Sequence, residues 1–153
     1  LERRGADPVI LREREEDPDA SARAAFANDA EADVLLSIHM NDHEDPGAEG
    51  SSSYYYGRLG TSSVAGHALA ELVQDELSAA TGLRDGRTHP KAFPILRETR
   101  MPAVQVEPCF ITNPKEEQLL VEEPFLREVA RAIVVAVERY FAGRALAEDG
   151  ARS

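Results

Sequence analysis

Cysteine is nearly absent from this sequence, with a single thiol among 153 residues. One thiol cannot form a disulfide within the chain, and a cysteine-ligated zinc site needs several. The single thiol, Cys109, follows an apolar run and Glu107-Pro108, with no basic residue beside it. We therefore interpret it as a small buried core residue rather than as a nucleophile.

Long apolar runs are absent as well. None approaches the ~20 residues that a membrane-spanning helix needs, so the sequence predicts no membrane span. No signal peptide is visible at the start of the chain. The first residue is Leu1 rather than methionine, which leads us to expect further sequence upstream.

Basic residues are scarce relative to acidic ones. The chain has 17 lysines and arginines against 28 aspartates and glutamates, giving a net charge of −11. Binding to the phosphates of nucleic acids needs basic patches, and an acidic surface repels anionic membranes. The chain is therefore predicted to bind no nucleic acid.

The motif G-x-S-x-G does not occur in the sequence, which argues against an α/β hydrolase with a nucleophile elbow.

The composition is that of an ordinary globular domain, with 42% hydrophobic and 29% charged residues. At this length a single domain can bury a substantial core. No internal repeat or linker divides the chain. We predict one domain over residues 1–143, followed by a C-terminal tail over residues 144–153.

Two short apolar runs each end in a residue that can bind a metal or transfer a proton. Residues 103–106 lead into Glu107, which Pro108 follows, and residues 34–38 lead into His39. Open α/β sheets collect their functional residues at the carboxyl ends of parallel strands. We therefore predict that Glu107 and His39 lie at one edge of one sheet, less than about 12 Å apart, as two groups around one metal would.

The remaining patterns alternate between strand and helix, which is typical of a mostly parallel sheet. Residues 51–57, with three serines, are predicted to form an edge strand, and their adjacent tyrosines cannot all share one face. The apolar spacing predicts the buried stripes Ala22, Ala25, Phe26 and Ala30; Leu69, Val73 and Leu77; and Phe125, Val129, Ile133, Ala136, Val137 and Tyr140. The predicted strands are 8–12, 34–38, 51–57, 95–97 and 103–106; the helices are 1–5 (last turn only), 20–32, 64–80, 114–120 and 123–141, with a loop over 83–94.

Three segments together carry a resemblance to a known family. Residues 32–41 read ADVLLSIHMN, residues 95–107 read ILRETRMPAVQVE and residues 110–114 read FITNP. This combination, in this order, resembles the zinc-dependent N-acetylmuramoyl-L-alanine amidases, which cleave peptidoglycan. The resemblance extends from Arg12 to Tyr140, and Arg23 and Asn28 also match residue types of the family. It implies a three-layer α/β/α fold with a mostly parallel central sheet, whose first strand and most of whose first helix are missing from this chain.

The resemblance also implies roles for site residues. His39 matches the last zinc ligand of the family, Glu107 matches the catalytic glutamate, and Asn41 is a candidate for substrate binding. The other two zinc ligands of the family precede the first residue of this chain. A lone imidazole does not hold Zn²⁺ against water, and a makeshift site of His39, His43 and Glu107 is the weaker alternative. The 153-residue chain by itself is therefore expected to bind zinc weakly and to be inactive.

Two functions remain open at this point. The first is a zinc-dependent amidase, located outside the cell or in the cell wall, that acts on peptidoglycan or muropeptides. The second is an inactive amidase-like module that senses peptidoglycan or regulates synthesis of its precursors in the cytoplasm. Residues 81–106 are similar to an actinobacterial branch with such a role, and the Ala- and Arg-rich composition fits that source. The presence of both His39 and Glu107 favours the enzyme.

Overall fold

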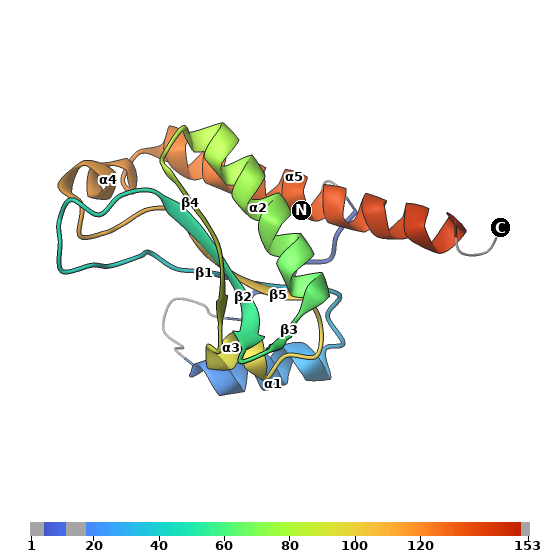
Figure 1. Cartoon of the computed structure of the whole chain (residues 1–153). Helices are drawn as coiled ribbons and strands as arrows, with labels where there is room; N and C mark the ends of the chain where they lie inside the picture. The colour runs from blue at the N-terminus through green and yellow to red at the C-terminus, as the bar shows by residue number, and fades with distance from the viewer. Residues whose placement is uncertain (1–4, 12–17, 151–153) are drawn as a thin grey trace.

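The computed structural model describes residues 5–11 and 18–150 of the chain (Figure 1). A central sheet separates two helical layers, with α2 and α5 on one face and α1 and α3 on the other (Figure 1). The predicted three-layer α/β/α fold is therefore confirmed. The elements are α1 (Ala20–Asp29), β1 (Leu35–Ile38), β2 (Ser51–Arg58), β3 (Thr61–Ser62), α2 (Val64–Thr81), β4 (Asp85–Lys91), α3 (Pro94–Arg97), β5 (Ala103–Glu107), α4 (Pro114–Leu119) and α5 (Glu123–Gly150).

The sheet is mixed rather than wholly parallel. Its strand order is β1-β5-β2-β3, and β4 also pairs with β2. The β1–β5 and β2–β4 pairs are parallel, whereas β2 pairs antiparallel with β5 and with β3. The prediction of an edge strand at β2 is therefore wrong, because β2 has neighbours on both sides.

Two buried serines of β2 form hydrogen bonds with a glutamine of helix α2. Gln74 is 3% exposed, and its amide nitrogen lies 3.0 Å from the Ser51 carbonyl and 2.8 Å from Asp85 Oδ1. Its amide oxygen accepts a hydrogen bond of 2.9 Å from the Ser53 hydroxyl. Buried polar groups cost little when they are paired in this way. A polar strand can therefore occupy the interior of this sheet, which composition alone does not predict.

Removing this amide is expected to destabilise the fold. Gln74→Leu would leave the buried hydroxyl of Ser53 and the carbonyl of Ser51 without their partner, at a cost of roughly 2–4 kcal/mol. Urea unfolding followed by circular dichroism measures the change. Gln118→Leu, at an exposed position of α4, is the matched control and should change the unfolding free energy by less than about 0.5 kcal/mol. Equal effects of the two substitutions would contradict this role.

The main core lies between the sheet and the α2/α5 layer. The predicted stripe of α2 is confirmed, because Leu69, Val73 and Leu77 are all completely buried. Ser63 caps the start of this helix through the Gly66 amide, and Gly82 ends it in the left-handed conformation at φ +66°. The predicted stripe of α5 is also buried throughout: Phe125, Val129, Ile133, Ala136, Val137 and Tyr140.

The helix α1 buries a different face from the predicted one. Asp19 caps it as expected, but Ala24 and Ala27 are the buried residues, and Phe26 is 54% exposed. In an alanine-rich helix several faces have almost the same hydrophobicity, so the spacing of alanines does not identify the buried side. Packing against α3 and the sheet makes that choice.

Two predictions between α2 and β5 are wrong. Residues 85–91, predicted as a loop, form β4, which pairs in parallel with β2 despite Pro90. Proline is tolerated where a strand lies at the edge of a sheet. Residues 95–97, predicted as a strand, belong to the short helix α3, which Pro94 begins. A run of two or three apolar residues does not distinguish strand from helix.

The predictions for the two ends of the chain also need correction. Residues 8–11 form no strand, and Val9 and Ile10 are 59% and 71% exposed, because no other strand in the described part of the chain pairs with them. Residues 1–4 and Arg12 lie outside the described residues. At the other end α5 continues past Gly143 to Gly150, since a single glycine weakens a helix without ending it. The domain limit at residue 143 stays a prediction.

Among the described residues, the helices are all too short or too polar to cross a lipid bilayer.

Candidate functional site

The parallel pairing of β1 with β5 brings His39 and Glu107 together. Ile38 pairs with Val106, and the His39 amide donates a hydrogen bond of 3.0 Å to the Val106 carbonyl. Paired strands lie about 4.8 Å apart, so the backbones of His39 and Glu107 are side by side. This is the sheet edge that the two apolar runs predicted.

The pairing continues beyond this point with a change of register. Ile38 pairs with Val106, whereas Asn41 pairs with Phe110, so the segment after β5 carries one extra residue between these pairs. Pro108 has no N–H to contribute here, as its ring requires. The irregularity directly follows Glu107, and such bulges often redirect a side chain next to a functional site.

The Glu107 carboxylate is held by neighbours on the same face of the sheet. The residue is only 8% exposed, and the amide nitrogen of Gln105 donates a hydrogen bond of 2.8 Å to Oε1. The hydroxyl of Tyr54, on β2 opposite Gln105, also hydrogen-bonds to this carboxylate. Two donors from two strands therefore fix the direction of a carboxylate that lies mostly out of solvent.

Burial raises the pKa of Glu107 above its ordinary value. The hydrogen bonds from Gln105 and Tyr54 oppose the rise, the negative charge of Asp42 adds to it, and Lys91 opposes it. A carboxylate whose pKa moves toward neutrality is a better match for general acid–base catalysis near pH 7. The electrostatics of this position therefore favour proton transfer.

Sequence reasoning did not identify Tyr54 and Gln105 as site residues. The Tyr54 ring packs against His89 and Phe93, at centroid distances of 5.8 and 5.7 Å, and burial together with the Glu107 charge raises the pKa of its hydroxyl. Alternation along the strand places Tyr54 and Tyr55 on opposite faces, and Tyr55 stacks on His67 of α2 instead. The prediction that the tyrosines diverge is confirmed. Only the strand pairing reveals which of them meets Glu107.

The raised pKa of Glu107 predicts how the stability of the metal-free protein depends on pH. The folded state binds this proton more tightly than the unfolded state does, so the free energy of unfolding falls as pH rises from the ordinary glutamate range through the raised pKa. Glu107→Gln removes the titration. Urea unfolding of both proteins in chelator, from about pH 4 to about pH 8, should show the variant gaining relative stability as pH rises. A difference in unfolding free energy between the two proteins that does not change with pH would contradict the raised pKa of Glu107.

Asn41 lies next to the pair, at a partly buried position. Its side-chain amide is 3.4 Å from the Tyr54 hydroxyl, and its backbone accepts a hydrogen bond of 2.9 Å from the Ile111 amide and donates one of 2.9 Å to the Cys109 carbonyl. The structure therefore places Asn41 within the same cluster as His39 and Glu107. Its substrate-binding role stays a prediction.

The described residues contain no complete metal site. A catalytic zinc normally has three protein ligands, and no group of three His, Cys, Asp or Glu side chains suited to a metal occurs within residues 5–11 and 18–150. His43 is exposed, and its Nδ1 accepts a hydrogen bond of 3.0 Å from the Asp45 amide. The makeshift site of His39, His43 and Glu107 therefore gains no support, and a complete zinc site needs ligands from outside these residues.

Cys109 is completely buried, as predicted, and its sulfur lies 3.8 Å from the Met40 sulfur. Burial and the negative charge of Glu116 raise its pKa to about 11. The thiolate is the reactive form of cysteine, so almost none is available near pH 7.

We expect Cys109 to react slowly with a thiol reagent in the native protein at neutral pH. Its low accessibility and its raised pKa both act in this direction. The same protein in concentrated urea is the control and should be labelled rapidly and completely. Fast labelling of the folded protein, measured by absorbance of the released reagent, would contradict the buried position.

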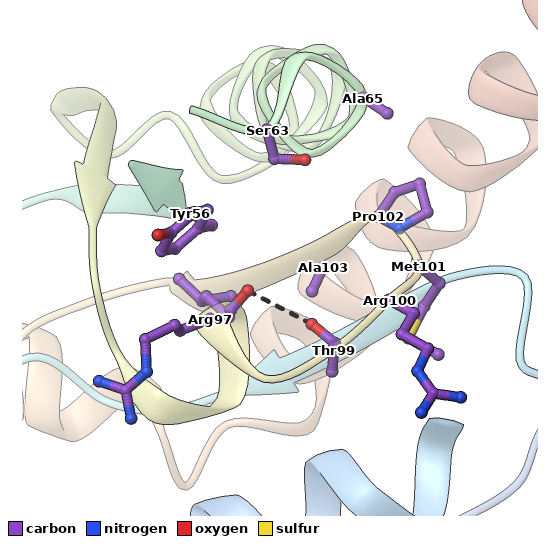
Figure 2. A pocket seen from close by; sticks show the side chains of 10 residues that line it. Tyr56, Ser63, Ala65, Arg97, Thr99, Arg100, Met101, Pro102 and Ala103 are labelled. Carbon is purple, nitrogen blue, oxygen red and sulfur yellow. Dashed lines mark hydrogen bonds between the residues drawn. The ribbon is translucent and has the colours of Figure 1, made fainter. Parts of the chain in front are cut away.

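A cavity of about 250 Å³ lies beside the start of β5 (Figure 2). Its lining includes Ala103, the first residue of β5, whereas Glu107 is the last residue of that strand. Figure 2 shows the Arg97 and Arg100 side chains extending away from the cavity. This cavity is therefore separate from the cluster around Glu107.

Curated relatives resemble this chain over most of its length. CwlM, an N-acetylmuramoyl-L-alanine amidase of Mycobacterium tuberculosis, is 36% identical over 138 residues, which is 90% of this chain and 34% of that protein. LytC, an N-acetylmuramoyl-L-alanine amidase of Bacillus subtilis, is 33% identical over 139 residues, or 90% of this chain and 27% of that protein. The chain therefore spans about a third or less of the length of these relatives.

Solved structures share the fold. The catalytic domain of CwlV, an N-acetylmuramoyl-L-alanine amidase of Paenibacillus polymyxa, superposes with a TM-score of 0.80 at 30% identity, covering 88% of this chain and 72% of that one. An N-acetylmuramoyl-L-alanine amidase of Clostridium difficile gives a TM-score of 0.77 at 32% identity, covering 82% of this chain and 66% of that one. The family model of N-acetylmuramoyl-L-alanine amidases matches residues 1–139. With its paired His39 and Glu107 strands, this chain belongs to the N-acetylmuramoyl-L-alanine amidase family.

Proposed function

We propose that the protein containing this chain hydrolyses the amide bond between N-acetylmuramic acid and L-alanine in peptidoglycan or muropeptides. The observation that carries the proposal is the Glu107 carboxylate, which ends β5 beside His39 in a member of this family. Its raised pKa suits a group that accepts a proton and then returns it. A cell-wall or extracellular location follows from this substrate class.

In this reaction Glu107 acts as the proton carrier. A water molecule gives its proton to the carboxylate while its oxygen attacks the lactyl carbonyl carbon. Glu107 then gives the proton to the nitrogen of L-alanine as the C–N bond breaks, which leaves an amine and a carboxylic acid that releases its own proton to solvent. Gln105 and Tyr54 hold the carboxylate in place for both transfers.

We further propose that His39 is one ligand of a catalytic zinc ion. The remaining ligands would come from outside the described residues, because these contain no group of three suitable side chains. Bound zinc would lower the pKa of the attacking water to near neutrality. Asn41, which lies within reach of the Tyr54 hydroxyl, is the proposed substrate-binding residue at the same sheet edge.

A second candidate is an inactive amidase-like module that senses peptidoglycan or regulates synthesis of its precursors. The incomplete ligand set of the described residues favours it. An inactive module, however, has no chemical need for a buried carboxylate with a raised pKa beside a histidine. The two candidates differ in whether the full-length protein binds zinc and cleaves muropeptides.

The deciding experiment compares the full-length protein with the 153-residue chain. Zinc content is measured by atomic spectrometry, and cleavage of a defined muropeptide is followed by the appearance of the L-alanine amine. We expect tight zinc binding and cleavage for the full-length protein, and neither for the 153-residue chain, since one imidazole does not hold the metal. A folded full-length protein that neither binds zinc nor cleaves would exclude the enzyme and leave the inactive module.

A further inference from the structure

A second buried carboxylate, which the proposed reaction does not use, lies close to the site. Glu116 of α4 is 4% exposed. Its Oε1 accepts a hydrogen bond of 2.7 Å from the Gly50 amide, and its Oε2 accepts one of 2.7 Å from the Phe110 amide. Burying a carboxylate is costly unless it is well hydrogen-bonded. These two short, charge-assisted bonds offset that cost.

The two amides belong to the two segments that leave the site. Gly50 is the last residue of the loop over residues 41–50, which begins just after His39, and Phe110 follows Glu107 by three positions. Glu116 lies on neither segment. Its carboxylate therefore ties the end of the loop that follows the His39 strand, where β2 begins, to the exit from the Glu107 strand.

Other hydrogen bonds fasten the same two segments along their length. The His43 amide donates to the Thr112 hydroxyl at 3.1 Å, and the side chain of Asn113 donates to the Ala48 carbonyl at 3.0 Å while its oxygen caps α4. The Thr112 contact is exposed to solvent, where water competes for it. The Glu116 bond to Gly50 is buried and is therefore harder to replace.

The backbone at Gly50 packs closely against Arg84, the residue before β4. Its φ is +105°, and a Cβ at this position would lie 2.2 Å from the Arg84 carbonyl oxygen. The Ser51 amide donates to that same carbonyl at 2.9 Å. The chain thus contacts the residue before β4 at the point where Glu116 accepts its hydrogen bond, so the carboxylate holds the loop where β2 and β4 begin to pair.

We propose that Glu116 is a positioning residue that fixes the separation between the His39 and Glu107 side chains by clamping the segments that follow them. The structural part of this inference depends on the hydrogen bonds that the Gly50 and Phe110 amides donate to the Glu116 carboxylate. The consequence of this clamp for catalysis rests on the proposed amidase function.

The test uses Glu116→Gln in the full-length protein. The side-chain amide presents one oxygen and one NH₂ group, so one of the two backbone amides loses its acceptor. Glu117→Gln is the matched control, because it removes the same charge from the adjacent, exposed position of the same helix. Glu116→Asp is a second variant that keeps the charge but is too short to reach both amides, and it serves if the glutamine variant does not fold.

Three quantities are measured: amide hydrogen exchange at Gly50 and Phe110, the ring resonances of His39 by nuclear magnetic resonance, and the kcat and KM for muropeptide cleavage. In Glu116→Gln we expect at least tenfold faster exchange at one or both amides, shifted His39 ring resonances, and kcat at least tenfold lower with a smaller change in KM. In Glu117→Gln we expect none of these changes.

The outcomes separate this inference from the proposed function. Unchanged exchange at both amides would exclude the clamp, and faster exchange with unaltered His39 resonances and kcat would leave Glu116 a structural residue only. If the wild-type protein has no amidase activity, the proposed function fails, while the His39 resonances still decide whether Glu116 positions the site.

Discussion

Glu107→Gln in the full-length protein is expected to abolish muropeptide cleavage without loss of bound metal or of folded structure. Glutamine matches glutamate in size but cannot accept the proton of the attacking water. Loss of a general base typically costs 10²–10⁴ in rate, so we expect kcat to fall at least ~10²-fold. The measurement is the initial rate of amine release at saturating muropeptide.

The position of the carboxylate makes this prediction specific. Glu107 is 8% exposed and accepts a hydrogen bond of 2.8 Å from the Gln105 side-chain amide, so the glutamine variant loses a carboxylate whose direction is fixed. Glu128→Gln, on an exposed face of α5, is the control and should retain full activity. A Glu107→Gln protein that keeps more than about a tenth of the wild-type rate would contradict a general-base role.

His39→Ala is expected to remove the metal itself. A catalytic zinc ion with three protein ligands that loses one imidazole retains two, which is too few to compete with water. Zinc content of the full-length protein should therefore fall from about one ion per chain to nearly none, and cleavage should stop with it. Atomic spectrometry after dialysis against a weak chelator measures the content.

A second histidine provides the comparison. His67 is also partly buried, but it lies on α2 and stacks on Tyr55, on the other face of the sheet. His67→Ala should keep its zinc and most of its activity. If His39→Ala retains stoichiometric zinc, the proposed ligand is wrong. If neither the wild-type nor the variant protein binds zinc, the inactive module is the better description.

Elements with a strong local pattern were predictable from the sequence. The apolar runs before His39 and Glu107 are long enough to indicate strands, and both strands are confirmed. The first is less buried than predicted, because β1 lies at the end of the strand order and Ile38 is 48% exposed. The stripes of α2 and α5 are confirmed for the same reason, since leucine, valine and isoleucine recur at helical spacing over several turns. In these segments burial and local preference agree.

Segments with weak or conflicting patterns were not predictable. The strand β4 contains glycine, histidine and proline, and it forms because its backbone pairs with β2. The buried face of α1 depends on where α3 packs, because Ala24 and Ala27 are no more hydrophobic than the alanines that stay exposed. In each case tertiary contacts override a local preference that is small.

The sequence by itself determined the fold class, the two strand ends that carry His39 and Glu107, and the family to which the chain belongs. These features depend on short contiguous segments whose residues are read directly. The tertiary structure alone decided that Tyr54 and Gln105 hold the Glu107 carboxylate and that Glu116 clamps the two segments leaving the site. Such contacts join residues far apart in the chain, and strand pairing and register create them, so no local pattern records them.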